Sequence, residues 1–181
     1  MIKTKNQLKD YLKYEKSLYI DSKVPVQKIL TSDVNLLLWR FVVYLRKTEY
    51  YHNKPSFASK FLYCYYRRKK NKLGIKLGIE MWDSCIDKGL TIYHAGNIVI
   101  NGMAKIGKDL KLHGSNCIGN DGITLDSPII GDNVRLGVGA KVIGGITLAD
   151  NITVAAGAVV VHSFEEPGIT IGGIPAKKLS R

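Results

Sequence analysis

The sequence predicts a mostly β protein, a parallel β-helix of hexapeptide rungs preceded by an α-helical domain. From Ile100 to Val160 an apolar residue stands at almost every sixth position, and ten of the eleven residues in this series are aliphatic. Gly or Ala often follows the aliphatic residue, as in Ile106-Gly107. All 18 glycines of the 181-residue chain lie at or after Gly74. A period of six fits neither an α-helix nor a hairpin sheet, but it is typical of the rungs of a β-helix.

The periodic series defines the expected coil domain, residues 75–181. Three hexapeptides close one coil, so each aliphatic side chain is expected to pack on the one eighteen residues later. Small or apolar residues also recur two positions before many members of the series. The series consists of Ile100, Ile106, Leu112, Ile118, Thr124, Ile130, Leu136, Val142, Leu148, Val154 and Val160.

Residues 1–74 are expected to form the helical domain, because they lack glycine until their last position and carry apolar residues at helical spacing. Three helices are predicted, over residues 6–20, 36–50 and 57–72. The run Thr31-Ser32-Asp33 provides an N-cap for the second helix, and Gly74 is expected to end the third. This domain is expected to pack on the first turns of the coil.

The helical domain also carries the entire net charge of +12, with 17 Lys and Arg against five Asp and Glu in residues 1–74. Residues 75–181 contain ten of each and are neutral. This asymmetry favours attraction to an anionic membrane surface. Nucleic acid is not expected as a partner, because the tyrosines beside the basic run 67–70 lie on a helix that must pack. Three unevenly spaced cysteines and the absence of a signal region favour the cytoplasm, with the inner face of the membrane as a peripheral location.

Four segments in order carry a resemblance to a known family: residues 92–101, 130–144 and 154–160, and the tail from Ile171 to Lys177. Together they resemble the hexapeptide-repeat acyltransferases over about residues 79–179. Within that superfamily the chain is most similar to the serine acetyltransferases and the related polysaccharide O-acetyltransferases. The resemblance implies a left-handed coil, a homotrimer, and acetyl-CoA bound in the groove between neighbouring coils.

His94 is the first candidate catalytic residue. Counting back in sixes from Ile106 and Ile100 gives position 94, where an inward aliphatic residue is expected and a histidine stands. Transfer of an acyl group from a thioester to a hydroxyl requires a base for the hydroxyl proton, and imidazole can serve. The resemblance places the catalytic histidine of the family at this position. The attack is expected to be direct, without an acyl-enzyme, and a backbone N–H beside the groove would stabilise the oxyanion.

Two further residues are candidates for the catalytic machinery. Glu80 would orient His94, since the family has an acidic residue in the segment that Gly78-Ile79-Glu80 resembles. Asp83 and Asp87 remain alternatives. His113 follows an inward leucine and could bind the acceptor or assist proton transfer, or it could be a plain surface residue of its rung.

The expected acceptor is a sugar hydroxyl of a cell-surface polysaccharide or its precursor. Serine acetyltransferases carry Asp directly before the catalytic histidine, where this chain has Tyr93. They carry Arg-His before a proline, where this chain has Asp126-Ser127. Asp and Arg suit the ammonium and carboxylate of an amino acid, so their loss favours a neutral acceptor. Tyr93, His113, Asp126 and Ser127 are the expected acceptor contacts.

The resemblance also suggests where acetyl-CoA binds, and no metal is expected. The slot-lining positions are Gly139, Ala140, Ala156 and Gly157, and the cationic tail that meets the phosphates is Lys177 and Lys178. Three alternatives remain open. They are a serine O-acetyltransferase of cysteine biosynthesis, a non-catalytic β-helix scaffold, and a zinc hydratase, for which only His94 and His113 are well placed.

Overall fold

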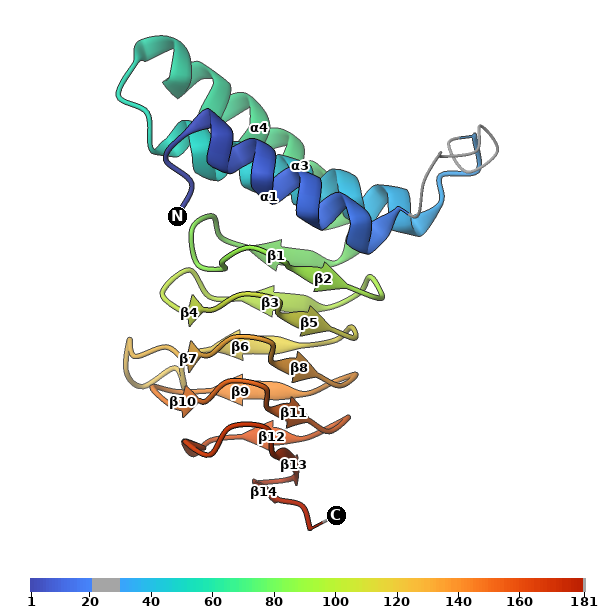
Figure 1. Cartoon of the computed structure of the whole chain (residues 1–181), viewed down its shortest axis with the longest axis vertical. Coiled ribbons are helices and arrows are strands. Elements are labelled where there is room, and N and C mark those ends of the chain that lie inside the picture. Colours follow the sequence, from blue (N-terminus) through green and yellow to red (C-terminus); the bar gives the residue numbers. More distant parts are fainter. Residues whose placement is uncertain (21–29, 181) are drawn as a thin grey trace.

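In the part of the chain that the structure describes, three helices lie across one end of a long β-coil, and the chain ends at the opposite end of the coil (Figure 1). This computed structural model describes residues 1–20 and 30–180. The helical layer consists of α1 (Lys5–Tyr19), α3 (Val34–His52) and α4 (Phe57–Leu77). Helix α1 contacts β2, and α4 leads directly into β1 and packs on it. The prediction that the N-terminal segment packs on the first turns of the coil is therefore confirmed.

Side chains just before α1 and α3 determine where these helices begin. The Thr4 hydroxyl accepts a hydrogen bond from the backbone N–H of Gln7, and the Gln7 side chain accepts one from the backbone N–H of Thr4. The Asp33 carboxylate accepts from the backbone N–H groups of Asn35 and Leu36. Both arrangements satisfy donors that the first turn of a helix leaves free. The predicted N-cap of the second helix is confirmed at Asp33.

Helix α4 does not end at Gly74, as the sequence suggested, but continues to Leu77. A Cβ atom on Gly74 would lie 2.5 Å from the carbonyl oxygen of Ile79 and 3.3 Å from the Phe41 ring. Glycine is therefore needed here because α4 passes close to β1 and α3. Gly78, with a φ of +67°, is the residue that ends the helix in the left-handed conformation.

The coil is made of short strands stacked into three sheets, one on each side. Sheet A has the order β1-β3-β6-β9-β12, sheet B has β10-β7-β4, and sheet C has β14-β13-β11-β8-β5-β2. Neighbouring strands are parallel, except that β14 pairs antiparallel with β13 at the C-terminal end. The strands are β1 (Ile79–Met81), β2 (Thr91–Ile92), β3 (Ile98–Ile100), β4 (Lys105–Ile106), β5 (Lys111–Leu112), β6 (Cys117–Gly119), β7 (Ile129–Ile130), β8 (Arg135–Leu136), β9 (Lys141–Ile143), β10 (Thr147–Leu148), β11 (Thr153–Val154), β12 (Val159–Val160), β13 (Thr170–Gly173) and β14 (Ala176–Lys178).

The expected spacing of eighteen residues per coil holds in part of the chain only. Leu136 pairs with Val154, eighteen residues later. Leu112 instead pairs with Leu136, twenty-four residues later. The reason is a loop, residues 120–128, between β6 and β7. Thr124, the one non-aliphatic member of the periodic series, lies exposed in this loop and is not a rung residue. Because the insertion is itself about six residues long, it leaves the sequence period intact.

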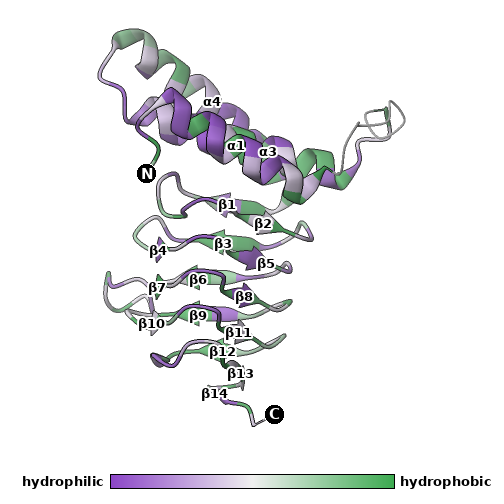
Figure 2. Ribbon diagram, in the orientation of Figure 1, coloured by the Kyte–Doolittle hydropathy of each residue, from purple (hydrophilic) through white to green (hydrophobic). Residues whose placement is uncertain are grey.

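One hydrophobic core runs along the inside of the coil and continues into the helical layer. Inward residues of the coil such as Leu136 and Val142 are completely buried, and Leu38, Phe41 and Leu45 of α3 belong to the same cluster. Figure 2 shows helices of mixed polarity lying on the first rungs of the coil. Burial of this apolar surface is the main force that holds the layer to the coil.

Helix α1 completes the hydrogen bonds of the first strand of sheet C. The Tyr19 hydroxyl accepts from the Ile92 N–H (2.8 Å) and donates to the Leu90 carbonyl (3.1 Å). The Glu15 carboxylate accepts from the N–H groups of Gly89 (3.0 Å) and Leu90 (3.2 Å). An edge strand otherwise leaves such groups unpaired. Side chains of α1 therefore take the place of a preceding rung.

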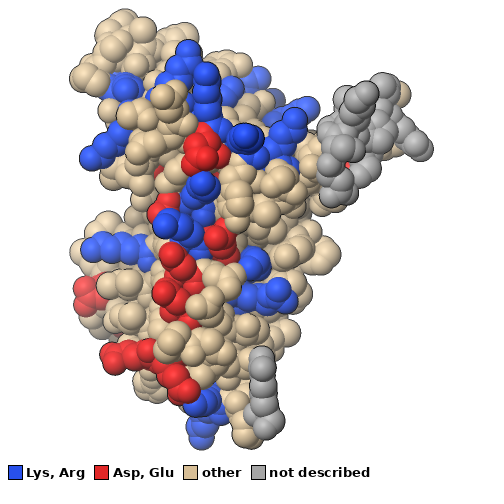
Figure 3. All heavy atoms as spheres, viewed as in Figure 1, with Lys and Arg blue, Asp and Glu red and all other residues tan. Residues whose placement is uncertain are grey.

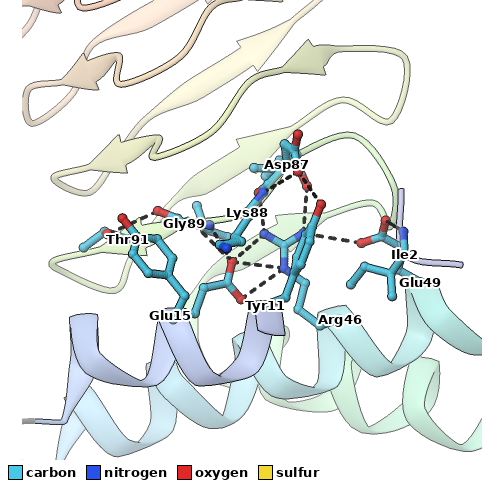
Figure 4. Close-up of polar contacts among 12 residues, drawn as sticks. Ile2, Tyr11, Glu15, Arg46, Glu49, Asp87, Lys88, Gly89 and Thr91 are labelled. Carbon is cyan, nitrogen blue, oxygen red and sulfur yellow. Dashed lines mark hydrogen bonds and ion pairs between the residues drawn. The ribbon is translucent and has the colours of Figure 1, made fainter. Parts of the chain in front are cut away.

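A buried arginine joins the helices to the same part of the coil (Figure 4). Arg46 of α3 is ion-paired with Glu15 at 2.6 Å and with Glu49 at 3.4 Å, and all three side chains are almost fully buried. It also donates to the backbone carbonyls of Ile86 (2.7 Å) and Asp87 (2.6 Å). A buried charge is tolerated when its hydrogen bonds are satisfied in this way.

The surface charge differs between the two parts of the molecule. On the face shown in Figure 3, Lys and Arg side chains gather on the helical layer, whereas both signs of charge occur along the coil. Within the described residues, no helix combines the length and the apolar character needed to cross a bilayer. The charge asymmetry of the sequence is therefore an asymmetry between the two ends of the molecule.

Candidate active site

Four turns of the chain stack on one another at the corner between sheets C and A, on the right of the coil in Figure 1. Backbone hydrogen bonds join them: Gly139 N–H donates to the Gly114 carbonyl at 2.9 Å. Gly157 N–H likewise donates to the Val138 carbonyl at 2.8 Å. Since rungs lie about 4.8 Å apart, this corner column is about 15 Å long. Its turns are residues 93–97, 113–116, 137–140 and 155–158.

His94 lies in the first turn of the corner column, and its side chain is exposed. The expectation that position 94 replaces an inward aliphatic residue is wrong. Ile92 is the inward residue, paired with Leu112. The next inward pair is Ile100 with Ile118. Ile100 follows Ile92 by eight residues, whereas Ile118 follows Leu112 by only six. The first turn therefore contains two extra residues, which carry His94 outward to the surface of the corner.

Gly114 and Asn116 support the turn that carries His94. A Cβ on Gly114 would lie 3.3 Å from the His94 Cβ, and Gly114 has a φ of +103°, so a larger residue is disfavoured there. Asn116 is completely buried; it accepts from the Gly114 N–H (3.0 Å) and donates to the Gly137 carbonyl (2.7 Å). Asn116 was not among the predicted site residues. The signal in the sequence is a polar residue two positions before Ile118, where the equivalent position before Leu112 is the apolar Leu110.

Tyr93 and His113 lie side by side next to His94. Their rings stack with centroids 4.5 Å apart and an interplanar angle of 26°. The His113 Nε2 atom is buried and has no hydrogen-bond partner among the described residues. Burial lowers the pKa of the His113 imidazole, and the nearby Arg135 and His94 side chains lower this pKa further. The structure thus brings three predicted residues together and leaves one ring nitrogen of His113 buried without a hydrogen-bond partner among the described residues.

The candidate orienting carboxylates lie elsewhere. Glu80 projects outward from β1 on sheet A and is exposed. Asp83 is ion-paired with His52 at 2.8 Å, and Asp87 belongs to the polar cluster under α1. Among residues 1–20 and 30–180, no carboxylate forms a hydrogen bond or ion pair with His94. The assignment of an orienting carboxylate stays a prediction.

Asp126 and Ser127 are on the opposite side of the coil from His94. They belong to loop 120–128, at the corner between sheets A and B, on the left in Figure 1. Within one chain, the structure does not bring these two residues to the corner column. The same loop exposes 90% of Ile123 and 81% of Leu125. Two large apolar side chains this exposed in one loop indicate an interaction surface.

Three of the four predicted slot residues face the corner column. Gly139 and Gly157 occupy positive-φ positions in its third and fourth turns, with φ of +73° and +69°. Ala156 is exposed beside them. Ala140 differs, because its side chain is fully buried inside the coil. At Ala140, only the backbone is therefore available to a ligand in the column.

The predicted cationic tail lies at the far end of the coil from His94. Lys177 and Lys178 are in β14, which closes sheet C. Lys178 is ion-paired with Glu166 at 2.6 Å. Lys177 is exposed and makes no ion pair within the described part of the chain. The phosphates of a ligand that extends along the column would therefore meet Lys177 as the unengaged cation.

Within the described residues, two hollows lie away from His94 and His113. They are adjacent grooves of about 480 and 590 Å³ on sheet A beside α4, and both are lined by Glu80, Trp82 and Val99. Neither groove is lined by His94 or His113. A site formed between neighbouring coils would not be a hollow in one chain, so the position of the grooves does not argue against the corner column.

The coil is similar in sequence to serine acetyltransferases. No protein-family model matches the chain. The enzyme of Buchnera aphidicola is 33% identical over 99 residues, which are 53% of this chain and 38% of the relative. That of Helicobacter pylori strain J99 is 33% identical over 107 residues, which are 58% of this chain and 62% of the relative. The chain thus matches between about two fifths and three fifths of the length of these relatives.

Solved serine acetyltransferases share the architecture of the whole chain. The soybean apoenzyme has a TM-score of 0.72 at 20% identity, covering 96% of this chain and 69% of the other. The Neisseria gonorrhoeae enzyme has a TM-score of 0.71 at 22% identity, covering 97% and 67%. A serine acetyltransferase in complex with CoA has a TM-score of 0.66 at 18% identity, covering 97% and 71%. The predicted fold, a left-handed parallel β-helix with an N-terminal helical domain, is confirmed.

These comparisons confirm the resemblance to hexapeptide-repeat acyltransferases and correct the expected acceptor. The relatives and structures named above are serine acetyltransferases, which contradicts the expectation of a sugar of a cell-surface polysaccharide. The argument for a sugar considered only the charges missing at Tyr93 and at Asp126-Ser127. It did not include Arg135, a cation close enough to His113 to lower its pKa.

Proposed function

We propose that this chain is an acetyl-CoA-dependent O-acetyltransferase whose acceptor is serine. The similarity of the coil to serine acetyltransferases supports the acceptor and the reaction. The observation that carries the proposal is the position of His94, which lies exposed on the Gly114 turn at the head of the corner column. An imidazole at this point can reach both a thioester lying in the column and a hydroxyl beside it.

In the proposed reaction His94 acts as the general base. Its imidazole takes the proton of the serine hydroxyl as the oxygen attacks the thioester carbonyl, and the tetrahedral oxyanion is stabilised by a backbone N–H of the column. Collapse of this intermediate breaks the C–S bond, and the CoA sulfur leaves with the proton from the imidazolium. Such a base contributes about 10²–10⁴ in rate. Glu80, the first candidate for orienting His94, and its alternatives Asp83 and Asp87 lie away from the imidazole within one chain, so the proposed reaction assigns no step to them.

The acceptor would bind beside His94 against the stacked rings of Tyr93 and His113. Tyr93 is 41% exposed and is therefore accessible to the acceptor, whereas the His113 Nε2 atom is buried. A serine carboxylate also needs a cation, and Arg135 is available because it makes no ion pair among the described residues. An arginine can bind a carboxylate through two parallel hydrogen bonds. Arg135, on strand β8 beside β5, would therefore supply the positive charge that is missing at Asp126-Ser127.

Acetyl-CoA would lie along the corner column. Gly139, Ala156 and Gly157 leave room for the pantetheine arm, and the backbone at Ala140 offers hydrogen bonds. Lys177 and Lys178 would meet the phosphates at the C-terminal end. The fit rests on a continuous line of small residues and backbone groups that leads from this end to His94.

We infer that the working form is a homotrimer. The exposed Ile123 and Leu125 of loop 120–128 support this inference, as do Met103 and Val138, which are 67% and 52% exposed on the coil. In a closed ring, this loop of one copy could approach the corner column of the next. Asp126 and Ser127 would then contact the acceptor from the neighbouring copy. Light scattering tests this directly: a trimer is expected, and an active monomer would contradict it.

The division of the chain into a helical domain and a coil domain at residues 74 and 75 is also part of the proposal, although α4 continues to Leu77. The proposed location is the cytoplasm, which the three unpaired cysteines support. Contact of the basic helical domain with an anionic membrane surface belongs to the same proposal.

The experiment that tests the catalytic proposal compares the full chain with its His94→Asn variant. Asparagine keeps a hydrogen-bonding group but cannot take the proton, so turnover of acetyl-CoA with L-serine should fall by about 10²–10⁴. Calorimetric binding of acetyl-CoA should stay nearly unchanged. His162→Asn removes an exposed histidine away from the corner column and serves as the matched control. Near-normal turnover by His94→Asn would place the base elsewhere.

A further inference from the structure

Six exposed residues form a straight stripe along α4, called here the α4 stripe. Their spacings of four, four, three, four and four residues place them on one face of the helix. The aromatic members expose 87%, 73% and 47% of their surface. Exposed aromatic side chains grouped in this way indicate an interaction surface. In chain order the members are Phe57, Phe61, Tyr65, Arg68, Lys72 and Lys76.

Within the described residues, the α4 stripe is the exposed face of the helix. The opposite face carries Lys70, Gly74 and Leu77, which are buried against α3 and the start of the coil. In Figure 1 the N-terminal half of α4 lies on the side of the helical layer that is farthest from the coil. The aromatic half of the stripe is therefore free to meet a large external surface.

The charge of α4 is entirely positive. The helix contains seven Lys and Arg and no Asp or Glu. Arg68, Lys72 and Lys76 make no ion pair within the described residues, and the blue side chains on the helical layer in Figure 3 belong to the same excess of charge. The stripe thus combines an aromatic half with a cationic half whose charges are not neutralised by the protein.

This combination argues against two of the three plausible occupants. A second copy packed on the stripe would bring two helices of like charge together, which is unfavourable. A single-stranded nucleic acid is bound in a basic groove, whereas the stripe is the convex surface of one helix. An anionic bilayer surface suits both halves, because aromatic rings settle at the headgroup level and each cation gains energy near anionic lipid.

We propose that the α4 stripe docks the protein on the surface of a membrane rich in anionic phospholipid. Phe57, Phe61 and Tyr65 enter the headgroup region, and Arg68, Lys72 and Lys76 lie at the lipid phosphates. The helical layer lies across the end of the coil (Figure 1), so the coil projects away from the membrane in this orientation. The corner column, on the side of the coil, stays open to dissolved ligands.

The test measures binding of the full chain to vesicles by sedimentation. The vesicles contain phosphatidylcholine with about a third phosphatidylglycerol, or phosphatidylcholine alone. Replacing the three cations by Arg68→Gln, Lys72→Gln and Lys76→Gln should lower the partition coefficient about 100-fold, since each cation near the surface contributes about a factor of five. Phe57→Ser with Phe61→Ser should lower it about 10-fold. Added salt should weaken binding of the unaltered protein, because exposed charges are screened.

A matched control removes the same charge from α1 through Lys5→Gln, Lys9→Gln and Lys13→Gln, which are exposed on a different helix of the layer. Binding of this variant should fall much less than that of the α4 variant. Equal losses would overturn the assignment to the stripe, as would equal binding of the unaltered protein to both kinds of vesicle. Loss of oligomeric state in either stripe variant, with vesicle binding unchanged, would identify the stripe as a contact between copies. Vesicle binding does not depend on acetyl transfer, so this test and that of His94 can fail separately.

Discussion

The coil and the helical layer are stabilised by different kinds of interaction. In the coil, each strand repeats the hydrogen bonds of the strand stacked beneath it. Inward aliphatic residues such as Leu136 stack on the equivalent residues one turn of the coil away. The helical layer is joined to the coil by non-repeating contacts, in which Glu15, Tyr19 and Arg46 bind backbone groups of the first rung. The comparison teaches that the first rung, which carries His94, depends on residues about fifty to eighty positions earlier in the chain.

Breaking the buried ion pair should have the largest effect on stability. Arg46→Ala leaves Glu15 buried without its cation, leaves Glu49 with only the N-terminal ammonium at 3.7 Å, and leaves two backbone carbonyls unpaired. The expected loss in the free energy of unfolding is about 3–5 kcal/mol, measured by urea denaturation. Lys178→Ala is the control at the other end of the molecule, where the ion pair with Glu166 is exposed and the loss should stay below about 1 kcal/mol. Similar losses in the two variants would contradict the proposed difference between the two ends.

Removing one hydroxyl from α1 should have a smaller effect that reaches the candidate site. Tyr19→Phe leaves the N–H of Ile92 and the carbonyl of Leu90 unpaired, which costs about 1–3 kcal/mol. Because Ile92 directly precedes the turn with His94, kcat should fall while the KM for acetyl-CoA is retained. Tyr14→Phe is the control, since its hydroxyl bonds to Asp109 at an exposed site. If the two variants had the same kcat, α1 would have no part in positioning His94.

The smallest expected effect is a change in how stability depends on pH. Folding lowers the pKa of His113 below its ordinary value of 6.5. Between the pKa of the folded chain and that of the unfolded chain, the unfolded chain therefore binds more protons. Stability contributed by neutral His113 is therefore present above pH 6.5 and is lost as the pH falls below it. His113→Gln should flatten this part of the profile in urea denaturation at a series of pH values. A variant with the same slope as the unaltered protein would show that His113 is not perturbed.

The repeating part of the molecule could be predicted from the sequence, and the reason is local. Each hexapeptide specifies its own rung, so the frame of aliphatic residues was sufficient to predict the coil. It could not reveal that Thr124 lies in a loop, because an insertion of about six residues keeps the same period. Nor could this pattern show that His94 points outward. The turn that carries His94 has two extra residues, and they shift the six-residue period only in the first turn of the coil.

The contacts that join the two parts could not be predicted, because no local pattern specifies them. Arg46 directly follows an apolar run and precedes Lys47, so an exposed helix position was as reasonable as a buried one. The sequence predicts that the third helix ends at Gly74, whereas in the structure this glycine allows the close approach of α4 to β1. In the candidate site, Tyr93 stacks on His113 because Ile92 pairs with Leu112, twenty residues later. A regular period of eighteen residues does not predict this pairing.

The most direct test of the proposed function is identification of the product formed from acetyl-CoA and L-serine. The full chain should form O-acetyl-L-serine and free CoA in equal amounts, detected by mass spectrometry and by a thiol assay. The His94→Asn variant should form neither above background while it still binds acetyl-CoA. Release of CoA that does not depend on serine, or binding of acetyl-CoA without any acetylserine, would contradict the account.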